Sequence, residues 1–269
     1  IPVFHDDQWG TAVITLSGVI NYAYLAGREL SSLKIVINGA GAAGIRICDM
    51  LKAAGAVNIV MCDKEGVLAK NRANLTGHKA RHAVETDLKT LKEALVGADV
   101  FIGVSAANVL SGEDVKTMSD FPAIFAMANP DPEIAPDEVA KALQGRQYVM
   151  VTGRSDYPNQ INNVLGFPYL FRGALDVRAT TINKEMKVAA ADALANLACQ
   201  SVPEDIKALY PNENLEFGTG YIIPKPFDRR LFVEVSYAVA EAAVKTGVAR
   251  LDVDLAAYRR DLERRNAER

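Results

Sequence analysis

Six small residues between an apolar run and a helical stretch have the spacing of a dinucleotide-binding turn. They read GAGAAG, a G-x-G-x-x-G pattern. Gly39 allows a tight turn, Gly41 lets the backbone approach a pyrophosphate, and Gly44 lets helix and strand pack closely. Together with Ala42 and Ala43 they begin a helix, whose unpaired N–H groups and positive dipole end attract phosphates. We predict that these residues bind a dinucleotide rather than only shaping a turn.

An acidic residue follows the next apolar run. Asp63 lies about 20 residues beyond the glycine motif, where a carboxylate can accept both hydroxyls of the adenosine ribose. Its charge would repel a 2′-phosphate, which favours NAD over NADP, although the adjacent Lys64 softens that repulsion. The alternative is a strand-end acid in solvent. NAD is therefore the expected cofactor, and NADP stays open.

Two adjacent carboxylates, Asp6 and Asp7, stand in front of a long uncharged stretch. Carboxylate oxygens are hard ligands that suit Mg²⁺ and Mn²⁺. Acids that precede a helix also interact favourably with its positive end. Taken alone, the pair fits either a metal site or a helix start.

Amide side chains stand at two further places between apolar runs. Asn129 follows an apolar run, and ligands of open α/β sheets bind beyond the carboxyl ends of strands. Asn162 and Asn163 are adjacent at the predicted start of a helix. Asn is well suited to cap a helix, but one cap needs only one Asn. The pair therefore leaves one amide free for a ligand.

The elements that position these residues alternate in type. Continuous apolar runs are separated by stretches of helical spacing, and such runs are typical of parallel strands covered on both faces. The runs occupy residues 34–39, 58–63, 99–105, 123–130 and 147–153. An amphipathic helix is expected at 87–98, and a helix interrupted around Gly166 and Pro168. We predict an α/β fold: a Rossmann-like doubly wound parallel sheet with flanking helices and a C-terminal helical segment.

Composition excludes several classes of protein. The net charge of −3 over 269 residues gives no general attraction to nucleic acid or anionic membranes. The three cysteines have neither zinc spacing nor a disulfide framework, which favours a reducing compartment, the cytoplasm. The uncharged stretch Gln8 to Gly27 is too polar for a membrane span, so a buried helix is expected. With no signal peptide at its start, the chain is expected to begin inside a longer protein.

A series of motifs resembles the malic enzymes, in particular the short bacterial and archaeal type. They are IPVFHDDQWGTA, INGAGAAG, GADVFIGVS, ANPDPEI, DYPNQINNVLGFPYLFRGALD and YIIPKPFD, in the family's order over nearly the whole chain. The resemblance implies oxidation of malate at C2 with hydride transfer to a nicotinamide, then decarboxylation to pyruvate and CO₂. It also implies a Mg²⁺ or Mn²⁺ that chelates the substrate and stabilises the enolate.

The same resemblance assigns roles to individual residues. Asp7 matches a metal ligand, and Asp6 matches its supporting neighbour. The sequence departs from the bacterial pattern at Trp9, where a His is frequent.

For the substrate and cofactor, the resemblance implies that Asn129 and Asn163 bind malate. Asn162 would lie near the nicotinamide, and Ser105 would line the nicotinamide ribose. The assignment between Asn162 and Asn163 stays open by one position.

The family's catalytic Tyr and Lys and its Glu-Asp metal ligands belong to an N-terminal region that no segment here matches. No catalytic residue is therefore assigned in this chain, which corresponds to the C-terminal, NAD-binding portion and is expected to be inactive alone. Residues 1–30 would hold the metal-ligand motif and a helix leading from the missing domain. Residues 31–225 would form the NAD-binding domain, and 226–269 the C-terminal helices.

The expected partners are malate or pyruvate, the missing N-terminal domain, and a second copy in a homodimer or larger assembly. Two other hypotheses remain open. One is a metal-independent dehydrogenase of amino acids with the same core, and the other is a dinucleotide-binding module without catalysis.

Overall fold

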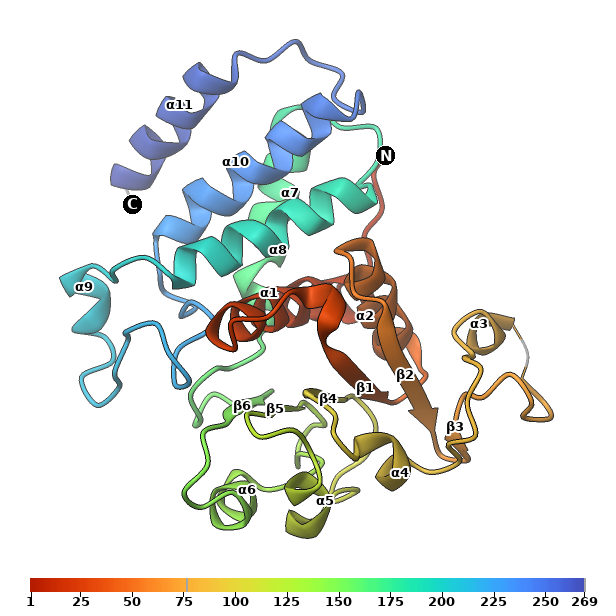
Figure 1. The fold of residues 1–269 in the computed structure, drawn as a ribbon. Coiled ribbons are helices and arrows are strands. Elements are labelled where there is room, and N and C mark those ends of the chain that lie inside the picture. The colour runs from red at the N-terminus through yellow and green to blue at the C-terminus, as the bar shows by residue number, and fades with distance from the viewer. Residues whose placement is uncertain (76, 269) are drawn as a thin grey trace.

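A parallel sheet with helices on both faces forms the body of the computed structural model, which describes residues 1–75 and 77–268 (Figure 1). In the described residues the sheet has six strands in the order β3-β2-β1-β4-β5-β6. Their bounds are β1 (Lys34–Asn38), β2 (Asn58–Asp63), β3 (Gly66–Val67), β4 (Val100–Gly103), β5 (Ala123–Ala126) and β6 (Val149–Thr152). All neighbours pair in parallel except β3, which is antiparallel to β2. The predicted doubly wound α/β fold is confirmed.

The strand order reverses direction between β1 and β4. The chain moves from β1 outward to β2 and β3, then returns to the other side of β1 and continues through β4, β5 and β6. Open sheets of this kind bind ligands beyond the carboxyl ends of the strands at the point of reversal. The glycine motif, which follows β1, lies at that point.

Two helical layers cover the faces of the sheet (Figure 1). The lower layer in the view consists of α4 (Leu91–Leu95), α5 (Gly112–Lys116) and α6 (Pro136–Ala142). The upper layer consists of η1 (Asp6–Gly10), α1 (Thr11–Leu25), α2 (Ala42–Ala53) and α8 (Lys184–Ala198). Beyond it lie α7 (Phe167–Asp176), α10 (Arg230–Lys245) and α11 (Leu255–Ala267). Short elements complete the list: η2 (Leu30–Ser32), α3 (Gly77–Ala80), η3 (Asn163–Leu165) and α9 (Glu204–Lys207).

One helix boundary differs from the sequence expectation, and one expected interruption is found. The helix expected from residue 87 begins only at Leu91, because Thr90 and Glu93 form a capping box that fixes its start. The interruption expected around Gly166 and Pro168 is present at Gly166, between η3 and α7, and Pro168 lies in the first turn of α7. Proline is well tolerated there, since the first N–H groups of a helix have no partner within it.

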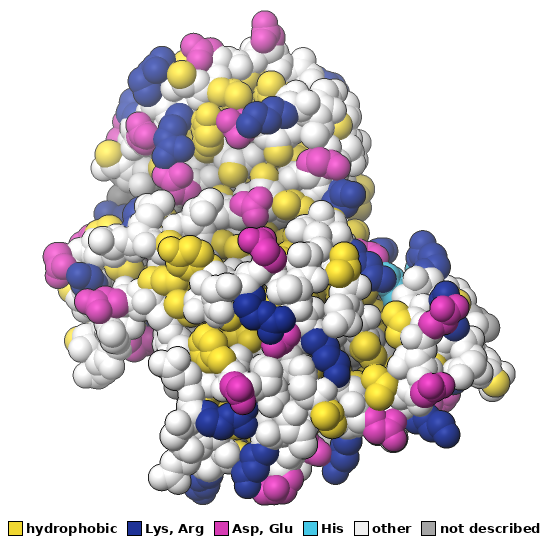
Figure 2. Space-filling view, viewed as in Figure 1, with side chains coloured by type: hydrophobic (Ala, Val, Ile, Leu, Met, Phe, Trp, Pro, Cys, Tyr) yellow, Lys and Arg dark blue, Asp and Glu magenta, His cyan; other side chains and the backbone are white. Residues whose placement is uncertain are grey.

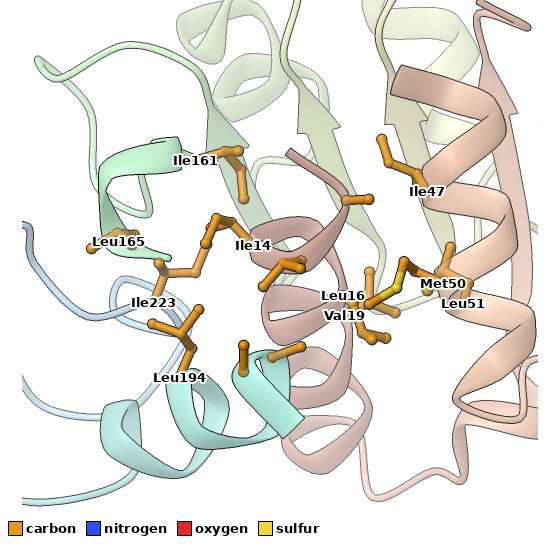
Figure 3. Close-up of a cluster of buried hydrophobic side chains, with 14 of the residues drawn as sticks. Ile14, Leu16, Val19, Ile47, Met50, Leu51, Ile161, Leu165, Leu194 and Ile223 are labelled. Atoms are coloured by element: carbon orange, nitrogen blue, oxygen red, sulfur yellow. The ribbon is translucent and has the colours of Figure 1, made fainter. Parts of the chain in front are cut away.

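Helix α1 is buried on most of its faces, as predicted from its uncharged sequence. In Figure 3, Leu16 and Val19 lie beside Met50 and Leu51 of α2, while Ile14 points toward other segments. A helix that is apolar all round requires such a buried position. Within the described residues, no helix has the length and apolar character that crossing a membrane requires.

A single cluster of buried hydrophobic side chains extends from Ala12 in α1 to Leu262 in α11. It includes residues of α2, the sheet, α7, α8 and α10. The sequence segments 1–30, 31–225 and 226–269 therefore share one core. The predicted boundaries between the three segments stay a prediction.

Candidate cofactor and active site

The three glycines of the motif have different structural roles. Gly39 has a φ of 123°, and a Cβ on it would lie 2.6 Å from the carbonyl oxygen of Val104. A Cβ on Gly44 would lie 1.8 Å from the carbonyl oxygen of Gly39. Gly41 has ordinary extended backbone angles, and its Cβ position has no atom within 4 Å. Gly39 and Gly44 thus serve the fold, whereas Gly41 keeps the space in front of α2 open.

That space is a cavity of about 660 Å³. Its walls include Gly41 and Ala42 at the start of α2, Gln8 of η1, and a basic segment that contains Arg72 and Lys79. The first N–H groups of α2, at Ala42 and Ala43, have no carbonyl partners within the helix, so they are available to phosphate oxygens. The predicted dinucleotide site therefore has both an open volume and an anion-binding end.

The carboxylate of Asp63 is already engaged. Its Oδ1 accepts hydrogen bonds from Arg72 Nη1 at 2.9 Å and from the backbone N–H of Glu65 at 2.9 Å. Its Oδ2 accepts from Arg72 Nη2 at 2.8 Å and from Lys79 Nζ at 2.7 Å. Burial acts to raise the pKa of Asp63, but the bonds from Arg72, Lys79 and Glu65 outweigh it and hold the pKa well below its usual range.

NAD was expected because a free Asp63 carboxylate could accept the ribose hydroxyls. The structure instead shows a carboxylate with two cationic partners, which nothing in the local sequence pattern indicated. Lys64, which was expected to soften the repulsion of a 2′-phosphate, is exposed and is not among the residues that line the cavity. The preference for NAD stays a prediction. The free Asp63 carboxylate that supported it is not present in the structure.

A buried acid that the sequence analysis did not single out links the loops at the carboxyl edge of the sheet. Glu133 Oε1 accepts the backbone N–H of Ser105 at 3.0 Å, and its Oε2 accepts that of Ala128 at 2.9 Å. Ser105 Oγ accepts a further bond from Asn38 Nδ2 at 2.8 Å. Burial raises the pKa of Glu133, although the backbone N–H donors partly oppose this shift. The ends of β1, β4 and β5 are therefore fastened together around Ser105.

The two adjacent amides have separate roles. Asn162 caps η3, since its Oδ1 accepts the backbone N–H of Val164 at 3.1 Å. Asn163 instead points to the N-terminal turn: its Nδ2 donates to Asp6 Oδ2 at 3.2 Å, and its Oδ1 accepts from Thr11 Oγ1 at 3.2 Å. Asn163 is thus the amide that contacts Asp6, and its role in binding the substrate stays a prediction.

The loop that carries Asn129 lies against α1. Thr15 Oγ1 donates to the sulfur of Met127 at 3.6 Å, and Thr15 is one turn along α1 from Thr11. Asn129 itself is exposed. Helix α1 therefore contacts both loops to which the sequence analysis assigned malate-binding amides.

The two carboxylates of the opening turn differ in their surroundings. Asp7 is exposed, whereas Asp6 is partly buried, and a Cβ on Gly10 would lie 2.1 Å from its Oδ1. That oxygen is buried and has no hydrogen-bond partner in the described part of the chain. Carboxylate oxygens are the ligands that hard divalent ions prefer. No group of three or more His, Cys, Asp or Glu in the described ranges could hold a metal, and Asp7 as a metal ligand stays a prediction.

Trp9 contacts two cations. The guanidinium carbon of Arg46 on α2 lies 4.7 Å from the centre of the indole, and Lys187 Nζ on α8 lies 3.9 Å from it. Cations over an indole are attracted by its electron-rich faces. Trp9, at the position where the family frequently has His, therefore links η1 to α2 and α8.

Lys187 is buried, and its ammonium donates to the carbonyl oxygen of Ile182 at 3.1 Å. Burial, with a contribution from the nearby Arg46, lowers the pKa of Lys187 to about 8. A lysine in an unfolded chain has a pKa of about 10.4. Between these values the unfolded chain binds a proton that the folded chain lacks, so stability rises with pH there. Below about pH 8 the cost of burying the charge is present in full.

We therefore expect Lys187→Met to raise the free energy of unfolding by about 1–3 kcal/mol at pH 7. The gain should disappear by about pH 10, where the parent lysine is neutral. Urea unfolding at the two pH values measures both effects. Lys184→Met, at an exposed position on the same helix, is the control and should change little. An equal gain from Lys187→Met at both pH values would contradict the assigned cost of the buried charge.

Comparison with known proteins gives consistent matches. The family described as "Malic enzyme, NAD binding domain" matches residues 9–215. An NADP-dependent malic enzyme of Rhizobium meliloti is 56% identical over 98% of this chain and 35% of its own length. An NAD-dependent malic enzyme of the same organism is 48% identical over 98% of this chain and 34% of its own length. The crystal structure of a malic enzyme from Pyrococcus horikoshii superposes with a TM-score of 0.85 and 36% identity, over 98% of this chain and 60% of that one.

Proposed function

This chain belongs to the malic enzyme family, as its motifs indicated, and we propose that it supplies the cofactor-binding part of an enzyme that converts malate to pyruvate and CO₂. The chain spans about a third of the length of the two curated relatives and 60% of the solved one. The remaining length in such relatives is where the family's catalytic Tyr and Lys and further metal ligands would lie.

One contact carries the proposal. Asn163 and Asp6 are 157 positions apart in the sequence, yet their side chains are hydrogen-bonded. This bond joins the motif proposed to hold the metal with the motif proposed to hold malate. The edge of the sheet that would receive the nicotinamide includes Ser105, which is fixed by Glu133. Metal, substrate and cofactor motifs thus belong to one body rather than to separate surfaces.

The residues have distinct tasks in this proposal. The N-terminus of α2 binds the pyrophosphate, and Ser105 orients the nicotinamide ribose. Asn163 and Asn129 donate to the malate carboxylate or hydroxyl and place C2 toward the nicotinamide. Asp7 would hold the divalent ion with Asp6 beside it, and the ion would act as a Lewis acid on the substrate oxygens.

Two observations weigh against the other hypotheses. A metal-independent amino-acid dehydrogenase has no use for the unpartnered oxygen of Asp6 beside the exposed Asp7. A dinucleotide-binding module without catalysis does not need Asn163 directed toward those carboxylates. The carboxylates of Asp6 and Asp7 and the direction of Asn163 both suit an enzyme that binds a hydroxy acid through a metal ion.

The test is an assay of NADH or NADPH formation with malate and Mn²⁺, on this 269-residue chain and on a protein that also contains the missing domain. We expect the chain alone to bind a dinucleotide without turnover, because hydroxyl deprotonation and enol protonation need a base and an acid. Lys225, the basic residue of the YIIPKPFD motif, is buried and paired with Glu213, so it is not available for either task. Turnover by the chain alone, or none by the longer protein, would overturn the proposal.

We also propose that the protein works in the cytoplasm as a homodimer or larger assembly. All three cysteines are free thiols, which suits a reducing compartment. Helix α10 packs its apolar residues against α7 and α8 of the same chain, so they are not free for a contact between copies. The exposed Val164 and Phe167, which follow Asn163, are the better candidates for contact with the missing domain or a second copy.

A further inference from the structure

A fully buried carboxylate lies at the carboxyl edge of the sheet. Glu133 is 0% exposed, and its two oxygens accept the backbone N–H groups of Ser105 and Ala128. A Cβ on Gly103, the last residue of β4, would lie 2.3 Å from Cδ of Glu133, so the absence of a side chain there makes room for the carboxylate. The carboxylate is therefore held against the end of β4, the strand beside β1.

The hydrogen bonds of Glu133 fit the ionised form. Both oxygens act as acceptors, whereas a protonated carboxyl group would need an acceptor for its own O–H. Burial raises the pKa of Glu133, and the groups that most oppose this shift are backbone N–H groups rather than cations. These N–H dipoles stabilise the negative charge but do not neutralise it, so a full charge remains in the interior.

The surface charges in view are mixed in sign. Lys and Arg side chains are interspersed with Asp and Glu over the face shown in Figure 2, so their fields largely offset one another. Salt also screens exposed charges, whereas it screens buried charges much less. The field of Glu133 therefore acts mainly on a group that binds at the adjacent edge of the sheet.

The nicotinamide half of a dinucleotide belongs at that edge in the proposed function. In this fold the pyrophosphate lies at the glycine turn after β1, and the adenosine ribose lies beside the end of the second strand. Strand β2 lies on one side of β1 and β4 on the other, so the nicotinamide half would extend over the end of β4. Ser105, which follows β4, is exposed there and is bonded directly to Glu133.

We propose that Glu133 favours the oxidised cofactor over the reduced one, because its buried negative charge attracts the positive charge of the oxidised nicotinamide ring. Hydride transfer removes that positive charge, since the reduced ring is neutral. Loss of the attraction after hydride transfer favours release of the reduced product. This inference rests on the dinucleotide site of the proposed function and goes beyond it, because it concerns which oxidation state the protein binds preferentially.

The expected size of the effect follows from the separation of the two charges. Two unit charges about 10 Å apart, at an effective dielectric constant of about 20, change an equilibrium constant about ten-fold. A ribose bound by Ser105 would bring the nicotinamide ring to about this distance from Glu133, because the backbone nitrogen of Ser105 lies 3.0 Å from Glu133 Oε1.

Calorimetric titration of the oxidised and the reduced cofactor into the purified protein tests the proposal. Glu133→Gln, which keeps the shape of the side chain and removes its charge, should raise the Kd of the oxidised form about ten-fold relative to that of the reduced form. Glu133→Asp keeps the charge, so it should leave the ratio of the two Kd values within about three-fold of the parent. A purely structural role for Glu133 would instead weaken both forms alike in both variants.

Glu138→Gln is the matched control. Glu138 also accepts a backbone N–H from the segment after β4, that of Gly112 at 2.6 Å, but its side chain is exposed. Removal of this exposed charge should change the ratio of the two Kd values less than about two-fold, because salt screens it.

The charge of Glu133 can also be measured in the parent, by NMR of its ¹³C-labelled carboxyl carbon. We expect the ionised form at pH 7, and a protonated Glu133 at that pH would overturn the proposal even if Glu133→Gln does not fold.

An unchanged ratio in Glu133→Gln, or an equal change in the Glu138→Gln control, would also overturn the proposal. The outcome is separate from that of the proposed function, because neither measurement needs malate turnover. A shifted ratio in a protein that never oxidises malate would contradict the proposed function alone, whereas a parent that binds neither form of the cofactor would overturn both.

Discussion

Gly41→Ala is expected to weaken dinucleotide binding about 100-fold or more while changing the free energy of unfolding by less than about 1 kcal/mol. Gly41 has backbone angles that alanine adopts readily, and a Cβ there would meet no protein atom within 4 Å. The methyl group would instead occupy the cavity in front of α2, where the pyrophosphate must approach the backbone. Titration with NADP⁺ and NAD⁺, together with urea unfolding, measures the two quantities.

Gly44→Ala, three residues along the motif, is the matched variant. Its Cβ would lie 1.8 Å from the carbonyl oxygen of Gly39, so strand and helix would have to separate. Overpacking of this kind typically costs about 1–3 kcal/mol of stability. Gly41→Ala should therefore affect mainly ligand binding, and Gly44→Ala mainly stability. Equal destabilisation by both would show that Gly41 is structural, and unchanged affinity in Gly41→Ala would remove the pyrophosphate from this turn.

Asp7→Asn, in the protein that contains the missing domain, is expected to lower kcat/KM for malate about 100-fold and to raise the Mn²⁺ concentration needed for half activation. The side chain is exposed and free to face an incoming ion, and an amide loses the anionic charge that balances a divalent cation. Dinucleotide affinity should stay unchanged, because the cofactor cavity is lined by other residues.

Asp6→Asn should have a smaller effect, about ten-fold, because supporting partners of metal ligands typically contribute 10- to 100-fold. Asp6 already shares its carboxylate with Asn163, and an amide retains part of that contact. If Asp7→Asn leaves the requirement for Mn²⁺ unchanged, Asp7 is only an acid at a helix start. If Asp6→Asn has the larger effect, the roles of the two carboxylates are exchanged.

The features that the sequence predicted well are those that depend on neighbouring residues. Continuous apolar runs gave the parallel strands, and the glycine spacing gave the turn after β1. The absence of charge in α1 gave its burial, because a helix without a polar face must be covered. Each of these patterns lies within about 20 consecutive residues, so it can be recognised from the sequence without knowing which distant segments are in contact.

The features that could not be predicted depend on partners from irregular or distant segments. Arg72 and Lys79 reach Asp63 from a loop and a four-residue helix that have no periodic pattern. Glu133 looks like any loop acid in its motif, and only the fold shows that it is buried under Ser105. The cations on Trp9 come from two helices that are far apart in the sequence.

The bond between Asn163 and Asp6 has a thermodynamic consequence for ligand binding. In the free protein, the amide assigned to malate is occupied by the protein's own carboxylate. A malate carboxylate that takes this amide replaces one acceptor by another, so no buried donor loses its partner. The displaced Asp6 then stands beside Asp7 with its carboxylate available to a cation. Malate and the divalent ion would therefore each increase the affinity of the protein for the other, by the same factor in both directions.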